Sequence, residues 1–337
     1  MSWFALAPLE LRCNGSNPRM VRKPQRSAKT ARRALRTHED ARGILSSHYL
    51  PDDDFDELWE KIKIATSQRD QLLAQAILNF ILRPKVNAAA VPLHGIILLV
   101  GPPGTGKTSL ARGLASRTAA SLEGFGEFAF LEVEPHSLMS ASHGKTQKAV
   151  QELLGQTVSE LAAQHPLIVL LDEVETLAAN RARMSLEANP VDVHRATDAV
   201  LAQLDHLAQK HKNLLFVATS NFPQAIDEAF LSRADLIVPI GLPSEDARAE
   251  ILHDTIEALV EAFPELAKLS ADLDFAELAR LTEGVDGRQL RKAVIGACSL
   301  DKTTALNPGQ LSSRALKESL KACRRSTGKG AKNGNGH

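Results

Sequence analysis

Gly101–Thr108, with the sequence GPPGTGKT, is the stretch that decides the fold of this chain. It follows directly on the apolar run Gly95–Val100 and opens a helix-forming stretch, Ser109–Ser116. Glycines let the backbone curl so that successive N–H groups point at phosphate oxygens, and the positive end of the following helix adds to the attraction. Eight matching positions between a strand and a helix predict a P-loop that binds a nucleotide.

Two side chains of this loop have their own expected roles. Lys107 is expected to reach the β- and γ-phosphates of ATP, and Thr108 to bind Mg²⁺. The predicted cofactors are therefore ATP and Mg²⁺. The predicted nucleotide-binding residues are Gly101, Pro102, Pro103, Gly104, Thr105, Gly106, Lys107, Thr108 and Ser109.

Five short aliphatic runs recur between helical stretches. They are apolar at nearly every position instead of alternating, which is typical of strands covered on both faces. The helices between them supply the crossovers that parallel strands need. After Pro243 the runs stop, and Ser244 is a predicted N-cap that opens a helical region. The sequence predicts an α/β domain with a parallel five-stranded sheet, followed by a small all-helical domain. The expected strands are Gly95–Val100, Phe128–Val133, Leu167–Asp172, Leu214–Ser220 and Leu236–Gly241.

The formal charge of zero hides an uneven distribution. The first 48 residues carry a net charge of +7 and the last 17 carry +5, against −12 for the rest. Both ends have little to bury, so we expect them to be flexible. The Arg-rich start also resembles a transit peptide, and a true start at Met20 explains the same composition. The predicted domains are a basic flexible segment 1–48, an α/β ATPase domain 49–243, a helical lid 244–320 and a basic disordered tail 321–337.

Two features of the sequence exclude a membrane-spanning protein and a small protein held together by disulfides or zinc. The apolar runs are too short to span a bilayer. Three cysteines, Cys13, Cys298 and Cys323, are too far apart for a disulfide scaffold or a zinc ribbon, and they are typical of a reducing compartment. We expect a cytoplasmic protein.

A second motif, Leu167–Glu173, brings two carboxylates to the end of an aliphatic strand, where ligands of parallel sheets gather. Asp172 is expected to complete the Mg²⁺ shell, and Glu173 to polarise a water for attack on the γ-phosphate. The alternative is a pair of acids that caps a helix.

Three further polar residues follow at strand or helix ends. Asn221 ends the next strand and is placed to hold the attacking water opposite Glu173, although Asn is also common in turns. Arg233 precedes the last strand, and Arg288 lies in the helical region. Each arginine has the alternative of an ordinary surface ion pair.

The order of these motifs resembles an AAA+ ATPase, with its sheet domain and helical lid. Further stretches resemble the pachytene checkpoint ATPases, which remodel HORMA-domain proteins, and the resemblance runs from about residue 50 to about residue 300. The eukaryotic members carry a folded adaptor-binding domain at the N-terminus, and we do not expect the 48 basic, poorly apolar residues here to form one, so the chain resembles a minimal prokaryotic member. The stretches are Leu50–Glu60, His136–Leu138, Asp172–Leu177, Ala199–Asp205 and Asp227–Phe230.

The resemblance assigns roles to residues named above. Arg233 becomes an arginine finger that reaches the γ-phosphate of a neighbouring subunit in a hexameric ring, an effect of about 10³ to 10⁵ in rate. Arg288 becomes the second sensor and Asn221 the first. The resemblance also implies that Trp59–Ile64 lines the adenine pocket.

The resemblance implies a substrate as well. Loops facing the pore of the ring would grip a HORMA-domain protein and convert it from closed to open. Leu138 and Met139 are the candidate grip, with packing at a helix start as the alternative, and 181–194 is a second candidate loop. Such prokaryotic relatives occur with a cGAS-like nucleotidyltransferase in antiphage systems. The competing hypothesis is a clamp-loader-type ATPase bound to nucleic acid, which the acidic body disfavours.

Overall fold

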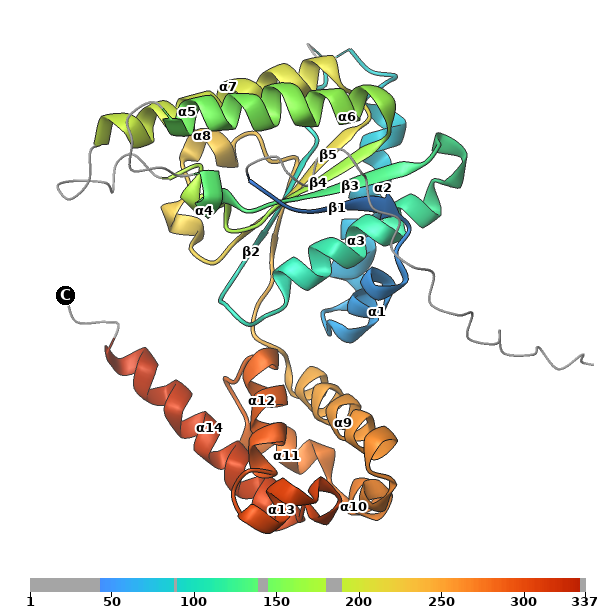
Figure 1. The fold of residues 1–337 in the computed structure, drawn as a ribbon, viewed down its shortest axis with the longest axis vertical. Helices are drawn as coiled ribbons and strands as arrows, with labels where there is room; N and C mark the ends of the chain where they lie inside the picture. The colour runs from blue at the N-terminus through green and yellow to red at the C-terminus, as the bar shows by residue number, and fades with distance from the viewer. Residues whose placement is uncertain (1–42, 88–89, 139–144, 180–189, 334–337) are drawn as a thin grey trace, which may run out of the picture. The chain divides into compact units, whose positions relative to one another are not determined.

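A six-stranded sheet forms the core of the N-terminal part of the computed structural model, which describes residues 43–87, 90–138, 145–179 and 190–333 (Figure 1). The strand order is β1-β3-β4-β5-β2-β6. Strands β2 to β6 are parallel, as predicted. The strands are β1 (Ile44–Leu50), β2 (Ile96–Val100), β3 (Phe128–Val133), β4 (Leu167–Leu171), β5 (Leu214–Ser220) and β6 (Leu236–Pro239).

Alternate apolar residues of strands β2 to β5 belong to two separate hydrophobic clusters. In β2, Ile96 and Leu98 pack into one cluster, while Ile97 and Leu99 pack into the other. Figure 1 shows α5, α6 and α7 on one side of the sheet and α1 and α3 on the other. Burial on both faces is why strands β2 to β5 are apolar at most positions.

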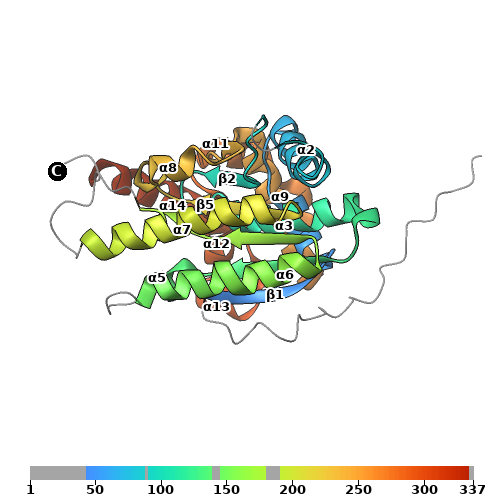
Figure 2. The same cartoon turned by 90° about the horizontal axis from the view of Figure 1, so that it is seen from above.

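The helices that cover the sheet are arranged in two layers, and in Figure 2 α7 runs alongside the segment from α5 to α6, which it contacts. A π-helical segment, Gln151–Val158, joins α5 to α6. Single 3-10 turns occur at Glu123–Phe125, Val174–Thr176 and Pro223–Ala225. The helices are α1 (Asp53–Lys61), α2 (Thr66–Leu82), α3 (Lys107–Ser121), α4 (Pro135–Leu138), α5 (Lys145–Val150), α6 (Ser159–Gln164), α7 (Pro190–Lys210) and α8 (Glu228–Leu231).

Strand β1 was not predicted, and its first residues fall inside the segment 1–48 that we expected to be flexible. It pairs antiparallel with β3 at the edge of the sheet, where His48 lies opposite Phe130. Its sequence, ILSSHYL, has polar residues at three central positions, so it lacks the aliphatic run that identifies the other strands. Ser47 and His48 are nevertheless buried.

A helical region follows the sheet, as predicted. Ser244 caps α9 by accepting the N–H of Ala247, and Asp286 caps α12 by accepting the N–H of Gln289. Apolar residues of α9, α11, α12 and α14 form a third cluster. The elements are α9 (Glu245–Ala262), α10 (Ala267–Asp272), α11 (Phe275–Leu281), α12 (Gly287–Ala297), α13 (Lys302–Leu306) and α14 (Ser313–Asn333), with 3-10 turns at Pro264–Leu266 and Pro308–Gln310.

Helix α14 corrects the boundary at residue 320, because it continues through Asn333 where we expected a disordered tail. Leu316 and Leu320 are fully buried in the third cluster, and Cys323 packs against it. Lys317 also pairs with Glu277 of α11, with the closer oxygen at 2.7 Å. The apolar stripe is spaced at helical intervals among basic residues, and composition alone hides that spacing.

The strand register determines where the functional loops lie. Val100 of β2 is level with Ser220 of β5, and Leu171 of β4 is level with Ala218. The residues that follow β2, β4 and β5 therefore meet at one edge of the sheet.

None of the described helices combines the length and the hydrophobicity that a membrane-spanning helix needs.

Candidate nucleotide-binding and hydrolysis site

The loop between β2 and α3 has the backbone of a phosphate cradle. Gly104 and Gly106 have φ angles of +83° and +89°, in the left-handed region that favours glycine. A Cβ at Gly106 would lie 2.5 Å from Cδ1 of Ile62. The loop runs directly into α3, whose first residue is Lys107. Free backbone N–H groups at this helix start suit an anionic ligand.

Lys107 lies with its ammonium inside the loop. Its Nζ donates to the carbonyls of Gly101 at 2.9 Å and Pro102 at 2.8 Å, and to Oδ1 of Asn221 at 2.8 Å. Burial lowers the pKa of Lys107 below its ordinary value, against the charges of Glu175 and other acids, which raise it. Phosphate oxygens would favour the protonated form, so the site fits an anionic group.

Asp172 and Thr108 meet across the loop. Thr108 Oγ1 donates to Oδ1 of Asp172 at 2.8 Å, and Thr219 Oγ1 also donates to Oδ1 of Asp172. Thr219 was not predicted from the sequence. Its position two residues before Asn221, at the end of β5, is the signal that identifies it in retrospect. A hydroxyl and a carboxylate side by side are oxygen ligands of the kind that Mg²⁺ prefers.

Glu173 turns away from the strand immediately after Asp172. Its φ of +53° lies in the left-handed region, which is uncommon for a residue with a side chain and is a known form of strain at functional sites. The N–H of Glu173 donates to Thr219 Oγ1 at 3.1 Å, which holds this turn. Asn221 Nδ2 donates to Oε1 at 3.0 Å, and His136 Nε2 lies 3.1 Å from Oε2.

Asn221 therefore links the two predicted motifs. It accepts a hydrogen bond from Lys107 and donates one to Glu173, while its own N–H donates to Oε1 of Glu175 at 3.1 Å. The sequence predicted Asn221 but missed Glu175 and His136. The cavity of about 150 Å³ at this point is lined by Pro103, Gly104, Gly106, Lys107, Thr108, Ser109, Asp172, Glu173, Thr219, Asn221 and Arg288.

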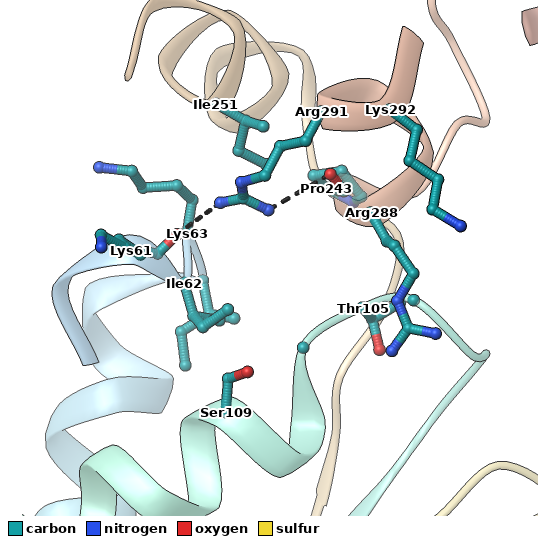
Figure 3. A pocket seen from close by; sticks show the side chains of 15 residues that line it. Lys61, Ile62, Lys63, Thr105, Ser109, Pro243, Ile251, Arg288, Arg291 and Lys292 are labelled. Carbon is teal, nitrogen blue, oxygen red and sulfur yellow. Dashed lines mark hydrogen bonds between the residues drawn. The ribbon is translucent and has the colours of Figure 1, made fainter. Parts of the chain in front are cut away.

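A second cavity, of about 290 Å³, lies beside the loop and continues toward the helical region (Figure 3). Ile62 and Ile64 line it from the segment between α1 and α2, and Ile251 lines it from α9. An apolar lining next to a phosphate loop suits the flat face of a base. Trp59 does not line it: the side chain is buried and packs against Gly113 of α3. Of the segment Trp59–Ile64 that was expected to line the adenine pocket, only residues 61–64 line this cavity.

Charged groups join the two sides of this base cavity. Arg291 Nη2 donates to the carbonyl of Lys61 at 3.1 Å (Figure 3). Lys63 Nζ lies 3.4 Å from Glu250 and 3.0 Å from Asp254 of α9. Burial alone would lower the pKa of Lys63, but the hydrogen bonds and charges of Asp254 and Glu250 raise it above its ordinary value.

The two predicted arginines lie in different places. Arg288, on α12, lines both cavities. Arg233 lines neither: it faces another cavity, with His94 and Asp205. Its Nε and Nη2 each donate to a carboxylate oxygen of Asp205 at 2.7 Å. The hydrogen bond from Arg233 lowers the pKa of Asp205.

Of the candidate substrate-gripping residues, Leu138 is described by the structure and is not exposed. Leu138 is 1% exposed and packs in the cluster on the α5–α7 side of the sheet, so its packing is that of a core residue. Met139 lies outside the described residues, as does most of the second candidate loop, 181–194. Of this candidate grip, only Leu138 is therefore described, and its side chain is not available to a substrate in this structure.

Comparisons with known proteins agree with this geometry. The profile of the ATPase family associated with various cellular activities matches residues 97–242. CD-NTase-associated protein 6 of Pseudomonas aeruginosa is 53% identical over 291 residues, which cover 86% of this chain and 95% of that protein. The putative pachytene checkpoint protein 2 of Caenorhabditis elegans is 35% identical over 214 residues, 62% of this chain, and the match spans half of that protein.

A solved structure shares the fold. The Escherichia coli MS115-1 HORMA:CdnC:Trip13 complex contains a chain that matches with a TM-score of 0.67 at 18% identity, over 82% of this chain and 94% of that one. The nucleotide loop and the strand-end acid pair, which line one cavity together with Arg288 of the helical region, are parts that ATP hydrolysis uses. The chain belongs to the AAA ATPases, in the group that contains CD-NTase-associated protein 6 and pachytene checkpoint protein 2.

Proposed function

We propose that the chain is an ATP-driven remodeller of a HORMA-domain protein, which it partly unfolds from a closed to an open state, and that it works as a hexameric ring. The observation that carries the ATP-driven part is the chain of contacts from Lys107 through Asn221 to Glu173. It joins the phosphate loop to the acid that would activate water. A protein that only bound a nucleotide, without hydrolysing it, would not need Glu173 or its strained backbone turn.

Thr108 and Asp172 are the proposed Mg²⁺ ligands. When bound, the ion would neutralise charge on the β- and γ-phosphates. Within the described residues, no three His, Cys, Asp or Glu side chains lie close enough together to form a metal cage. The remaining ligands would thus be phosphate oxygens and water, which is usual for Mg²⁺. Glu173 accepts the proton of the attacking water, and Asn221 orients that water from the opposite side.

The proposed role of Arg233 is to act on the ATP of a neighbouring subunit. Its guanidinium lines neither cavity of its own nucleotide site, which supports action across an interface. Arg288 lines both cavities and is the proposed sensor within its own subunit. Ring assembly then switches hydrolysis on, because each active site is completed by the next subunit.

The proposed substrate rests on the relatives. One is by name associated with a CD-NTase, and the solved complex with the same fold contains HORMA and CdnC chains. We propose that this chain acts on a HORMA-domain protein, and through it on a cGAS-like nucleotidyltransferase of an antiphage system in the cytoplasm. Residues 49–320 carry a net charge of −12, and this negative charge disfavours contact with nucleic acid.

Glu173→Gln tests the proposal. The amide keeps the shape of the side chain but loses the charge that polarises water, so ATP binding and ring formation remain while turnover falls at least 100-fold. The matched control is Glu123→Gln, an exposed acid on a 3-10 turn, which leaves turnover unchanged. Normal hydrolysis by Glu173→Gln would remove Glu173 from the mechanism.

The same variant identifies the substrate. Glu173→Gln protein is loaded with ATP, used to capture partners from its native cell lysate after nuclease treatment, and analysed by mass spectrometry. We expect a HORMA-domain protein that is released when ATP is omitted. Replication proteins, or partners lost on nuclease treatment, would instead support the nucleic-acid hypothesis.

A further inference from the structure

Arg233 is held in one orientation by its own subunit. It follows α8, and Asp235, two residues later, accepts backbone N–H groups of His94, Gly95 and Ile96 at 2.6 to 3.1 Å. These contacts fix the chain on the C-terminal side of Arg233 to the start of β2. The backbone from which the guanidinium extends is therefore rigid.

The guanidinium itself has three contacts within the subunit. Nε and Nη2 donate side by side to the two oxygens of Asp205, each at 2.7 Å, and Nη1 donates to the carbonyl of Ala229 at 2.5 Å. An arginine has five N–H donors in a plane. Three are used here, so one N–H remains on each terminal nitrogen. Two parallel donors on a fixed plane match two oxygens of a phosphate.

We propose that Asp205 is a positioning residue for the arginine finger: it holds Arg233 by Nε and Nη2 so that the remaining N–H groups face the ATP of the neighbouring subunit. This inference rests on the proposed function, in which Arg233 acts across the interface. Asp205 lies on α7, and its side chain is 37% exposed, against 22% for Arg233. The pair is thus at the surface, where a neighbouring subunit has access to it.

An opposite role is physically reasonable. Asp205 can act as a latch that holds Arg233 away from the neighbour until the ring assembles. The two roles have consequences of opposite sign. Removing a positioning contact lowers the rate, because a finger that is free to rotate spends less time in the productive geometry. Removing a latch raises the rate.

Asp205→Asn is the informative change, since it keeps the size of the side chain but offers the guanidinium one acceptor oxygen where the carboxylate offers two. We expect kcat of the assembled ring to fall about tenfold or more, with KM for ATP and ring assembly unchanged, because the subunit's own nucleotide site is intact. Gln209→Ala is the matched control: Gln209 lies one turn further along α7 and lines the same cavity. A rise in kcat for Asp205→Asn would overturn the proposal in favour of the latch.

Mixed rings locate the defect. Asp205→Asn subunits have a working nucleotide site and a misplaced finger, whereas Lys107→Ala subunits have a working finger and no nucleotide site. In a mixed ring, some Asp205→Asn subunits have a Lys107→Ala subunit as the neighbour that supplies the arginine finger. Each such pair combines a working nucleotide site with a working finger. We therefore expect the mixture to have at least threefold more activity than the two separate preparations together. Mixing Asp205→Asn with Arg233→Ala restores nothing, because both lack a working finger.

Arg233→Ala mixed with Lys107→Ala separates the two levels of the proposal. If that mixture fails to recover activity, Arg233 does not act across the interface and the proposed ring mechanism fails. If it recovers while the mixture of Asp205→Asn and Lys107→Ala does not, the ring mechanism stands and the role of Asp205 is wrong. Equal melting temperatures of Asp205→Asn and the parent ensure that neither result reflects unfolding.

Discussion

The phosphate cavity and the base cavity are built in different ways, although they are joined in one nucleotide site. In the phosphate cavity, hydrogen bonds link side chains that follow buried parallel strands, as between Asn221 and Glu173 at 3.0 Å. In the base cavity, the segment from Lys61 to Ile64 faces helices α9 and α12. There the links between the two sides are long charged side chains, such as Lys63, near the surface.

The difference reflects what each half has to do. Phosphates need donors at fixed positions, and strand ends in a buried sheet supply a rigid mount for them. The base cavity is instead lined from both the sheet domain and the helical region, and we expect the two sides to move apart when nucleotide exchanges. Exposed ion pairs suit this because each contributes only about 0.2 to 1 kcal/mol and is easily broken.

Lys107→Ala should break the phosphate half and have the largest effect. It removes charge-assisted hydrogen bonds to phosphate, which are worth about 1.5 to 3 kcal/mol each, so we expect on the order of 100-fold weaker ATP binding by calorimetry. Lys85→Ala, an exposed lysine near the end of α2, is the control and should bind ATP normally. A Kd within threefold of the parent would show that the loop backbone alone holds the nucleotide.

The contrast also explains what the sequence could predict. Gly101–Thr108 and Asp172–Glu173 are local patterns next to aliphatic runs, and the strand register brings them together with Asn221 as expected. Thr219 was not predicted because its role depends on contacts with Asp172 and Glu173, which follow the neighbouring strand β4. The base cavity depends on contacts such as Arg291 to Lys61, which are 230 residues apart and follow no motif.

The same reasoning applies to the parts of the fold that were missed. Strand β1 is polar at its centre and gains its stability from pairing with β3, so it has no signal of its own. Residues 321–333 are basic enough to resemble a tail, yet they continue helix α14, and Cys323 packs against the apolar cluster that contains Leu316 and Leu320. In both cases tertiary contacts outweigh composition.

Lys63→Glu should weaken the base cavity and leave the phosphate cavity intact. It removes the pairs with Glu250 and Asp254 and adds repulsion, so we expect a 3- to 10-fold rise in KM for ATP with kcat unchanged. Because the charges lie near the surface, the effect should shrink as salt is raised. Combining it with Asp254→Lys should restore KM. A fall in kcat at constant KM would mean that Lys63 serves the chemical step instead.

Asp286→Ala should have the smallest effect, although Asp286 lies where the two halves meet. Its carboxylate caps α12, the helix that carries Arg288 and Arg291. It also lies close enough to the phosphate loop that a Cβ at Gly104 would be 2.3 Å from its Oδ1. Losing an N-cap costs about 1 kcal/mol.

We expect this to lower the Tm by about 2 to 4 °C, measured by calorimetry without nucleotide. Asp286→Asn keeps a capping oxygen and should stay within about 1 °C of the parent. If Asp286→Asn lowers the Tm as much as Asp286→Ala, the charge matters more than the cap. The carboxylate would then act mainly on the positive start of α12 and on the basic residues Arg288 and Arg291, and the helical region would be coupled to the phosphate loop by electrostatics.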